Sequence, residues 1–188
     1  MNLKRFLDLL LVLSLALPLS IPMAFLILIL KLSSRESILF WSKRVGVRNQ
    51  SFMMPKFRTM REDTPQLATH LIPNPEKYFL PLGAFLRATS FDEVPQLWSI
   101  FKGDMSFVGP RPALFNQDDL IVLRSQYGVD KLVPGLTGWA QVNGRDELSI
   151  AEKVRYDVEY LKRQSFLFDI KIIGLTFLKV VCRSGISH

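Results

Sequence analysis

The chain has 188 residues, of which 48% are hydrophobic, and its 24 Lys and Arg outnumber its 17 Asp and Glu to give a formal net charge of +7. One cysteine and two histidines exclude a disulfide framework and a cysteine-rich or multi-histidine metal site within one chain. The length suits one domain, the apolar fraction excludes a disordered chain, and the positive charge predicts an anionic partner: nucleic acid, phospholipid headgroups or a phosphorylated substrate.

The positive charge is confined to the first third of the chain. Residues 1–62 carry ten basic and three acidic side chains, whereas residues 63–188 carry 14 of each. The excess flanks Leu9–Leu30, a run of 22 residues without a charge. As a helix this run would be about 33 Å long, enough to cross the hydrocarbon core of a bilayer. We therefore expect membrane phospholipids, and not nucleic acid, to be the anionic partner of this region.

The apolar run has three interpretations: a signal peptide, a straight transmembrane helix or a re-entrant helical hairpin. A signal peptide fits poorly, because no clear small-residue cleavage site follows. Pro18 and Pro22 each remove a helix hydrogen bond and favour a bend, and Ser20 between them can bond a freed carbonyl. Basic residues lie on both flanks, and both flanks lie in the cytoplasm only if the segment enters and leaves by one face. The residues alone leave the straight helix and the hairpin open.

The rest of the chain predicts short elements of an α+β fold that is mostly helical. A β-hairpin is expected from Ile38–Val47 and Ser51–Phe57, and a loop from Thr64–Tyr78, which contains three prolines. Residues 109–112 (GPRP) form a rigid turn. Helices are predicted at Leu80–Arg87, Val94–Phe101, Gln117–Tyr127, Ser149–Gln164 and Ser165–Arg183.

The last predicted helix carries an apolar stripe at Phe166, Ile170, Ile173 and Phe177. Such a stripe packs on the core of the domain, or it lies in the interface of a membrane with lysines near the headgroups. The apolar run and its basic flanks favour the membrane interface, but the pattern of the stripe does not decide between the two interpretations.

One segment, RATSFDEVPQL at residues 87–97, places two carboxylates where a helix is predicted to begin. Ser90 and Glu93 have the spacing of a capping box; alternatively Asp92 is the cap, which puts Pro95 in the first turn. In a functional interpretation, an ionised Asp attacks phosphorus as a nucleophile and the adjacent Glu holds Mg²⁺. Cations for a diphosphate would come from Lys56, Arg58, Arg87, Arg111 and Arg145.

Four motifs in this order resemble the bacterial sugar transferases, and more specifically the small monotopic polyprenyl-phosphate phosphoglycosyl transferases. They are KFRTM at residues 56–60, RATSFDEVPQL at 87–97, KGDMSFVGPRP at 102–112 and PGLTGWAQVNGR at 134–145. The resemblance runs from about Lys4 to Ser187. It implies a compact cytoplasmic catalytic domain at residues 33–188, with interfacial amphipathic helices and an N-terminal re-entrant membrane hairpin at residues 1–32. In the family the membrane helix breaks at a Ser-Pro pair; this chain has Ser20 and Pro22, with Pro18 in addition.

The resemblance also implies a reaction at the bacterial inner membrane. A UDP-sugar donates sugar-1-phosphate to undecaprenyl phosphate, UMP leaves, and the product begins the assembly of O-antigen, capsule or another glycoconjugate. By the motif match, Asp92 forms a covalent aspartyl phospho-sugar intermediate, and Glu93, with Asp92, coordinates Mg²⁺. An N-acetylated sugar is weakly favoured, and no residue identifies it.

Further roles follow from the same match. Lys56, Arg87 and Arg111 are assigned to phosphates, whereas Asp157 and Asp169 are read as structural. The glycine-rich motif is placed near the nucleotide, since its glycines permit close approach of the backbone to a ligand. Its expected binding residues are Pro134, Gly135, Thr137, Gly138 and Arg145.

Two other classes of function compete with this one. An ordinary glycosyltransferase would release UDP in place of UMP. A non-enzymatic protein that binds anionic lipid or nucleic acid through its basic N-terminal third would need neither Asp92 nor Glu93.

Overall fold

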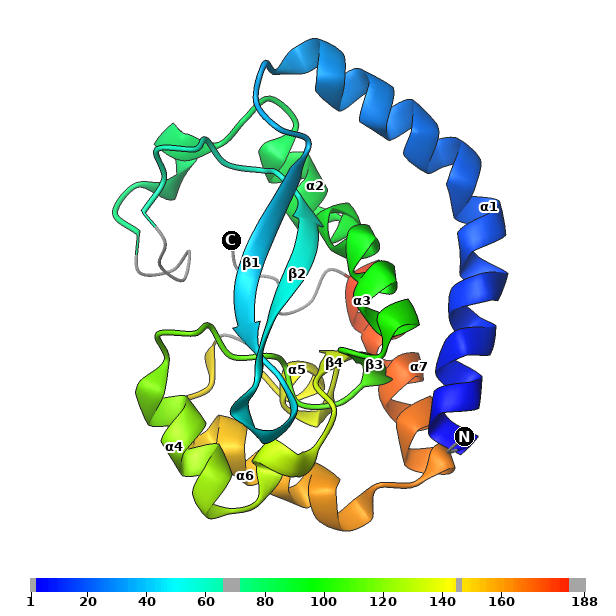
Figure 1. Ribbon diagram of the computed structural model, residues 1–188, viewed down its shortest axis with the longest axis vertical. Coiled ribbons are helices and arrows are strands. Elements are labelled where there is room, and N and C mark those ends of the chain that lie inside the picture. Colours follow the sequence, from blue (N-terminus) through cyan, green and yellow to red (C-terminus); the bar gives the residue numbers. More distant parts are fainter. Residues whose placement is uncertain (1–2, 66–71, 145–146, 183–188) are drawn as a thin grey trace.

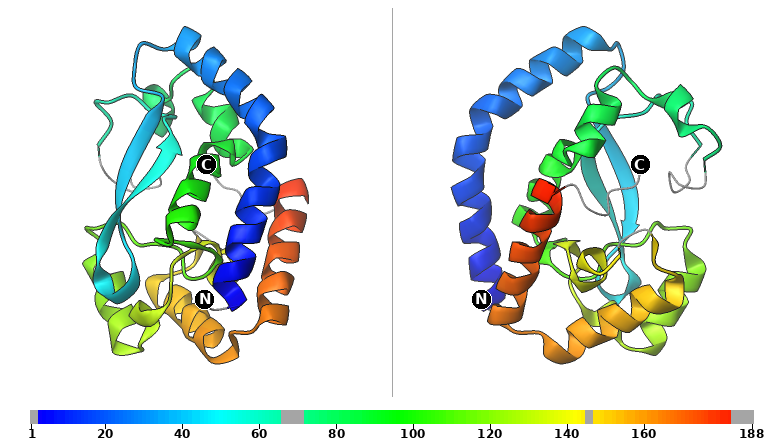
Figure 2. Two further views of the ribbon diagram at one scale, coloured as in Figure 1. Left: turned by 45° about the vertical axis from the view of Figure 1, so that its right-hand side comes forward. Right: turned by 180° about the vertical axis from the view of Figure 1, so that it is seen from behind.

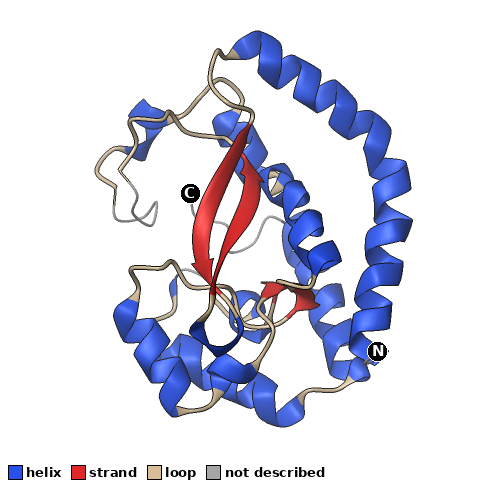
Figure 3. Ribbon diagram, viewed as in Figure 1, coloured by secondary structure: helices blue, strands red, loops and turns tan. Residues whose placement is uncertain are grey.

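A computed structural model describes residues 3–65, 72–144 and 147–182 of the chain. The fold is α+β and mostly helical, as predicted, with two small two-stranded sheets among the helices (Figures 1 and 3). The main α-helices are α1 (Leu3–Ser33), α2 (Gly83–Ala88), α3 (Leu97–Lys102), α4 (Asp118–Gln126), α5 (Trp139–Val142), α6 (Ile150–Arg163) and α7 (Phe166–Cys182). Short 3₁₀ turns are η1 (Val47–Asn49), η3 (Pro75–Tyr78), η4 (Phe91–Gln96) and η5 (Val129–Lys131).

The apolar run lies within one continuous helix, α1, which bends along its length like a bow (Figure 1). Two helical arms joined by a turn are therefore not formed, and the expected hairpin shape is corrected to a bent helix. Pro18 and Pro22 lie inside it and supply the physical cause of the bend. The Ser20 hydroxyl donates to the carbonyl of Leu17 at 2.7 Å, which is not one of the carbonyls that the prolines free.

Both ends of α1 pack on the same domain, while its middle does not. Near the N-terminus, Val12 packs with residues of β2 and α3; near the other end, Leu30 packs with Phe57 and Leu86. Between them, Leu17 and Ile21 are each 80% exposed. Within the described residues, α1 is the one helix long and apolar enough to cross a membrane by length and composition.

Polar contacts fix the N-terminal end of α1 to the domain. Lys4 donates to Asp169 of α7, and Arg5 donates to the carbonyl oxygens of Ile100 and Phe101 at the end of α3. The buried carboxylate of Asp8 accepts hydrogen bonds at 3.1 Å from the Ser106 hydroxyl and from the next backbone N–H. Asp169 is structural, as predicted, because its two oxygens are held by Lys4 and by a tyrosine hydroxyl of α6.

The predicted β-hairpin is confirmed. β1 (Leu39–Val45) pairs antiparallel with β2 (Ser51–Phe57) around the tight turn of η1. The hairpin crosses the centre of the molecule, with α2 and α3 behind it and α4 to α6 at its turn (Figures 1 and 2). Its last strand therefore carries Lys56 into the middle of the domain.

A second sheet of two parallel strands, β3 (Ser106–Val108) and β4 (Gly135–Thr137), depends on glycine. A Cβ added to Gly135 would lie 2.1 Å from the backbone nitrogen of Gly109, and one added to Gly138 would lie 2.1 Å from the Gly109 carbonyl oxygen. These glycines permit the close approach of two backbone segments, and that approach sets the turn that follows β3.

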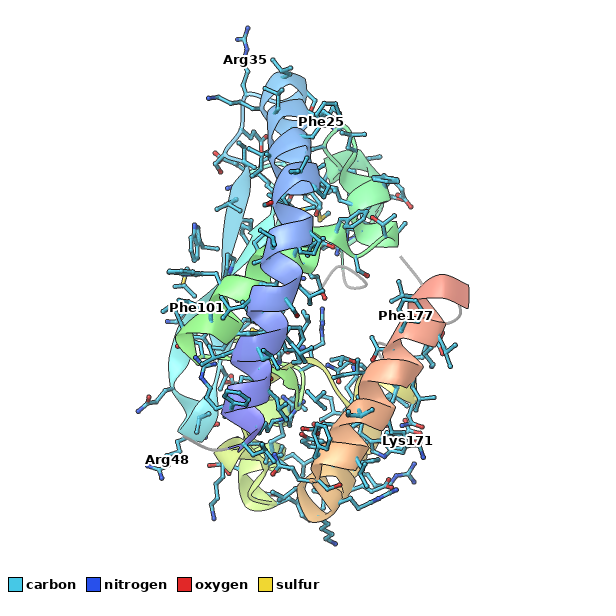
Figure 4. The ribbon with its side chains drawn as sticks, turned by 90° about the vertical axis from the view of Figure 1, so that its right-hand side faces the viewer. Phe25, Arg35, Arg48, Phe101, Lys171 and Phe177 are labelled. Carbon is cyan, nitrogen blue, oxygen red and sulfur yellow. The ribbon has the colours of Figure 1, made fainter. Side chains whose placement is uncertain are left out.

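The apolar stripe predicted on the last helix does not pack on the core. In α7 the buried residues are Phe168 and Ile172, whereas Ile170 is 51% exposed and Phe177 is 68% exposed. The core-packing interpretation of the stripe is therefore wrong. Figure 4 shows α1 and α7 on one face of the molecule, with Phe177 and Lys171 on α7. That this face lies in a membrane interface stays a prediction.

We expect Gly135→Ala to destabilise the fold by at least about 1–3 kcal/mol, because the added methyl group meets backbone atoms that have no room to move. Gly174→Ala is the matched control: nothing lies within 4 Å of its added Cβ, and alanine favours a helix interior, so its stability should be unchanged or slightly higher. Urea unfolding followed by circular dichroism measures both. Equal stabilities for the two variants would contradict the packing role of Gly135.

Candidate active site

The segment that carries the two carboxylates forms the 3₁₀ turn η4, directly after α2. Ser90 lies between α2 and η4 and has a left-handed backbone (φ 58°). Its carbonyl oxygen accepts a hydrogen bond from the backbone N–H of Glu93 at 3.1 Å. The Ser90 side chain makes no capping hydrogen bond, and the turn begins at Phe91. Both predicted caps, Ser90 with Glu93 and Asp92 alone, are therefore wrong, because the chain turns sharply at Ser90 and enters a tighter helix.

Four charged side chains form a cluster at this turn: Asp92 and Glu93 of the turn itself, Lys56, and the partly exposed Arg111. Glu93 Oε1 accepts a hydrogen bond from Lys56 Nζ of β2 at 2.8 Å and another from Arg111 Nη2 of the turn after β3 at 2.8 Å. The same Lys56 nitrogen lies 3.7 Å from Asp92 Oδ2. The side chains of Asp92, Glu93 and Lys56 are each at most 16% exposed. The fold thus brings together Lys56, Glu93 and Arg111 with Asp92, the predicted nucleophile.

The electrostatics of the two carboxylates differ. Burial raises the pKa of Asp92, and the neighbouring cations only partly oppose this. Burial acts in the same direction on Glu93, but the charges and hydrogen bonds of Arg111 and Lys56 outweigh it and hold the pKa of Glu93 well below its usual range. Glu93 is therefore a fixed anion that organises the cations, whereas Asp92 is poorly solvated, which favours reaction with an electrophile.

Two further predicted cations lie at the edge of the cluster. Arg87 stacks over the ring of Phe79, with 5.6 Å between its guanidinium and the ring centroid, and its charge is one of those that act on Asp92. Arg58 donates to the carbonyl of Ser37 at 3.0 Å and lies over the ring of Phe40. Both line the same cleft as Asp92.

A buried ion pair supports Arg111 from behind. Arg124 of α4 donates to the carbonyl oxygen of Arg111 at 2.8 Å and makes two hydrogen bonds, of 2.9 and 2.7 Å, to Oδ2 of Asp157 on α6. Asp157 is 1% exposed and is structural, as predicted. Sequence reasoning missed Arg124, because a single arginine in a helix with little amphipathic pattern gives no signal of its role.

The cluster opens into a cleft of about 800 Å³, a volume within the range of small-molecule sites. Its walls come from both strands of the hairpin, the loop after β2, η4, the segment after Arg111, and α4 to α6. Of the lining side chains that the structure describes, nine are basic and three are acidic, so the cleft suits a ligand with several negative charges. The basic ones are Lys43, Arg44, Lys56, Arg58, Arg61, Arg87, Arg111, Arg124 and Lys153.

The glycine-rich segment packs beside the turn that follows β3. Pro134, Gly135, Thr137 and Gly138 lie outside the lining of this cleft, and the Thr137 hydroxyl pairs with a threonine of α7 at 2.6 Å. The segment contacts the Gly109 backbone, described above, and its expected contact with the nucleotide stays a prediction. Arg145 lies outside the described residues. Among the described residues of the segment, the polar one that lines the cleft is Gln141, which was not predicted.

The carboxylates also fit the predicted Mg²⁺. Mg²⁺ in proteins is held by one or two carboxylates and completes its coordination with water and substrate phosphates. Glu93 Oε1 is engaged by two cations, which leaves its second oxygen and the oxygens of Asp92 as ligands. The described residues contain no cluster of three or more His, Cys, Asp and Glu side chains, so phosphate oxygens of a substrate would supply the remaining ligands.

The match to known proteins agrees with this geometry. The sequence profile described as "Bacterial sugar transferase" matches residues 1–183. The chain belongs to the bacterial sugar transferase family. All four motifs that form or support the site in this sugar transferase lie inside the matched region.

Individual relatives are a little over one third identical to this sugar transferase across the aligned residues. The "Uncharacterized sugar transferase EpsL" of Bacillus subtilis is 37% identical over all of this chain and 92% of its own length. The "Exopolysaccharide production protein ExoY" of Rhizobium meliloti is 36% identical over 93% of this chain and 84% of its own length. The "UDP-glucose:undecaprenyl-phosphate glucose-1-phosphate transferase" of Escherichia coli is 37% identical over 94% of this chain, which covers only 40% of that protein.

We expect Asp157→Ala to lower the free energy of unfolding by about 3–5 kcal/mol, because it leaves the Arg124 guanidinium buried without its partner. Asp63→Ala, which removes the partner of the exposed Arg61, should cost at most about 1 kcal/mol. Chemical denaturation of the two variants in detergent measures both values. A loss at Asp157 no larger than that at Asp63 would show that the buried pair does not support this region.

Proposed function

We propose that this sugar transferase moves sugar-1-phosphate from a UDP-sugar to undecaprenyl phosphate and releases UMP. The observation that carries the proposal is the poorly solvated carboxylate of Asp92 beside the fixed triad of Glu93, Lys56 and Arg111, in a basic cleft of a size that suits a nucleotide-sugar. Relatives from Escherichia coli, Xanthomonas campestris and Komagataeibacter xylinus are named as glucose phosphotransferases that act on undecaprenyl phosphate.

In the proposed first step, a carboxylate oxygen of Asp92 attacks the phosphorus nearest the sugar. The bond from that phosphorus to the bridging oxygen breaks, and UMP leaves with this oxygen and its electron pair. In the second step an oxygen of undecaprenyl phosphate attacks the same phosphorus, the bond to Asp92 breaks, and the carboxylate is restored. All attacking and leaving groups are anionic oxygens, so neither step requires a proton carrier.

Phosphoryl transfer of this kind depends on positioning and charge neutralisation more than on acid–base chemistry. Lys56 and Arg111 face the carboxylates from two different elements and are placed to hold phosphate oxygens. Asp92 and Glu93 would hold Mg²⁺, which when bound neutralises part of the charge on the diphosphate. Burial of the triad fixes these groups before substrate arrives, which lowers the cost of reorganisation.

The acceptor keeps its polyprenyl tail in the bilayer, so the proposal requires the site to lie at a membrane surface. The bent α1 supports a re-entrant, monotopic attachment, because both of its ends pack on one domain and a straight span would separate them. Its basic flanks, with the exposed stripe of α7, support a cytoplasmic domain resting on the inner membrane. Figure 4 shows Phe25 of α1 and Phe177 of α7 on the face of the molecule that these two helices form.

The identity of the sugar is a separate question. The relatives whose names state a sugar name glucose or galactose, and none of these names an N-acetylated sugar. A panel of UDP-glucose, UDP-galactose and their N-acetylated counterparts, with undecaprenyl phosphate and Mg²⁺, tests both sugar and reaction. UMP as product supports the proposal and UDP indicates an ordinary glycosyltransferase; omission of Mg²⁺ tests the metal.

We expect Asp92→Asn to reduce UMP release at least about a thousandfold, because an amide cannot form the acyl phosphate. When the acceptor is left out, intact-mass spectrometry should find the added mass of one sugar phosphate on the wild-type protein and none on Asp92→Asn. Asp104→Asn is the control, since it removes a carboxylate that pairs only with Lys102 on the surface. Full turnover by Asp92→Asn would exclude Asp92 as the nucleophile.

We expect both flanks of α1 to be labelled only from the cytoplasm. Leu3→Cys and Arg35→Cys place a thiol at exposed positions on the two sides of the bend, in a background in which Cys182 is replaced by serine. In intact cells a membrane-impermeant maleimide should react with neither, and in inverted membrane vesicles it should react with both. Reaction of one of them in intact cells would show that α1 spans the membrane.

A further inference from the structure

Among the described residues, the side-chain amide of Gln141, a residue that lines the cleft, has no hydrogen-bond partner. Both polar atoms of the Gln141 side chain, Oε1 and Nε2, are shielded from solvent, and no hydrogen-bond partner for either lies among the residues that the structure describes. Buried amides are normally hydrogen-bonded, because an unpaired one destabilises the fold. Gln141 lines the same cleft as Asp92, Glu93 and Arg111.

The backbone around this amide is held firmly. Gln141 lies in the single turn of α5, whose first residue, Trp139, donates its indole N–H to Glu159 at 2.9 Å. The Asn143 side chain donates back to the carbonyl of Trp139 at 2.7 Å, and Val142 is buried in the core. The backbone that carries the Gln141 side chain is therefore held at a defined position beside the cleft.

The amide also lies next to the turn that carries Arg111. A Cβ added to Gly138 would lie 2.7 Å from Gln141 Oε1 and 2.1 Å from the carbonyl oxygen of Gly109. Glycine at position 138 thus makes room for the Gln141 side chain beside the Gly109–Arg111 turn. A ligand whose phosphates reach Arg111 would have its adjoining neutral groups near this amide.

We propose that Gln141 binds a neutral group of the nucleotide-sugar that both donates and accepts hydrogen bonds, and so helps to select the donor. This inference rests on the proposed function. An amide offers one acceptor oxygen and an NH₂ donor, which complements the imide edge of uracil or the hydroxyls of the sugar. A phosphate offers acceptors alone and would leave Oε1 unpaired. The basic side chains of the cleft already provide hydrogen-bond donors for phosphates.

The test compares Gln141→Leu with the wild-type protein in detergent, by KM and kcat for UDP-glucose and by calorimetric Kd for UMP. Gln141→Met, which keeps the length of the side chain, is the second variant should the first not fold. We expect KM for the donor to rise about tenfold, the equivalent of one lost hydrogen bond, with kcat within about twofold. The thermal unfolding temperature should not fall, since the Gln141 side chain makes no hydrogen bond to any residue that the structure describes.

Binding of UMP, which lacks the sugar, distinguishes the two candidate groups, uracil and the sugar hydroxyls. A weaker Kd for UMP assigns the amide to the nucleotide, and an unchanged Kd with a raised donor KM assigns it to the sugar. Gln126→Leu, on the exposed surface of α4, is the matched control and should change neither value. Unchanged donor KM and UMP Kd in an active Gln141→Leu enzyme would overturn this inference alone, as would a change confined to the KM of undecaprenyl phosphate. Absence of UMP release by the wild-type protein would instead overturn the proposed function.

Discussion

One carboxylate oxygen, Oε1 of Glu93, accepts hydrogen bonds from two cations, and the arrangement of the catalytic end of the molecule depends on it. Lys56 reaches it from the hairpin and Arg111 from the turn after β3, so three segments that are distant in sequence meet at a single atom. Removal of the Glu93 carboxylate would leave Lys56, which is 16% exposed, without its short ion pair, and this costs more than the loss of a surface ion pair. Asp92 is the adjacent residue in the chain, so the contacts of Glu93 also position it. Its own ion pair, with Lys56 Nζ, is longer, at 3.7 Å.

The supports of that junction lie behind the Arg111 backbone and in the strand contacts beside it. The buried pair of Arg124 and Asp157 holds the carbonyl of Arg111, and the glycines of β4 bring the preceding backbone into place. The charge cluster is thus backed by a rigid scaffold, as a site that works by positioning requires. The same holds for the backbone that carries Gln141, which is fixed by the contacts of Trp139, Val142 and Asn143.

The sequence predicted the elements whose signals are local. The alternation and turn residues at 38–57 predicted the hairpin, and the motif around Asp92 and Glu93 located the candidate site. What failed depended on tertiary contacts: the turn at Ser90 replaced both predicted caps, and the stripe of Ile170 and Phe177 faces outward because α7 buries Phe168 and Ile172 in its place. The role of the glycines in residues 134–144 could not be predicted from the sequence. A glycine that makes room for a ligand and one that makes room for another strand give the same sequence pattern.

The docking of α1 has a consequence for the order of biosynthesis. Lys4 pairs with Asp169, 165 residues later in the chain, and Arg5 caps α3 some 95 residues later. The apolar helix leaves the ribosome long before these partners exist, and its exposed middle would aggregate in water. If α1 enters a membrane as proposed, it does so before these partners are made, and the domain then forms its contacts with Lys4 and Arg5 against a helix that is already inserted.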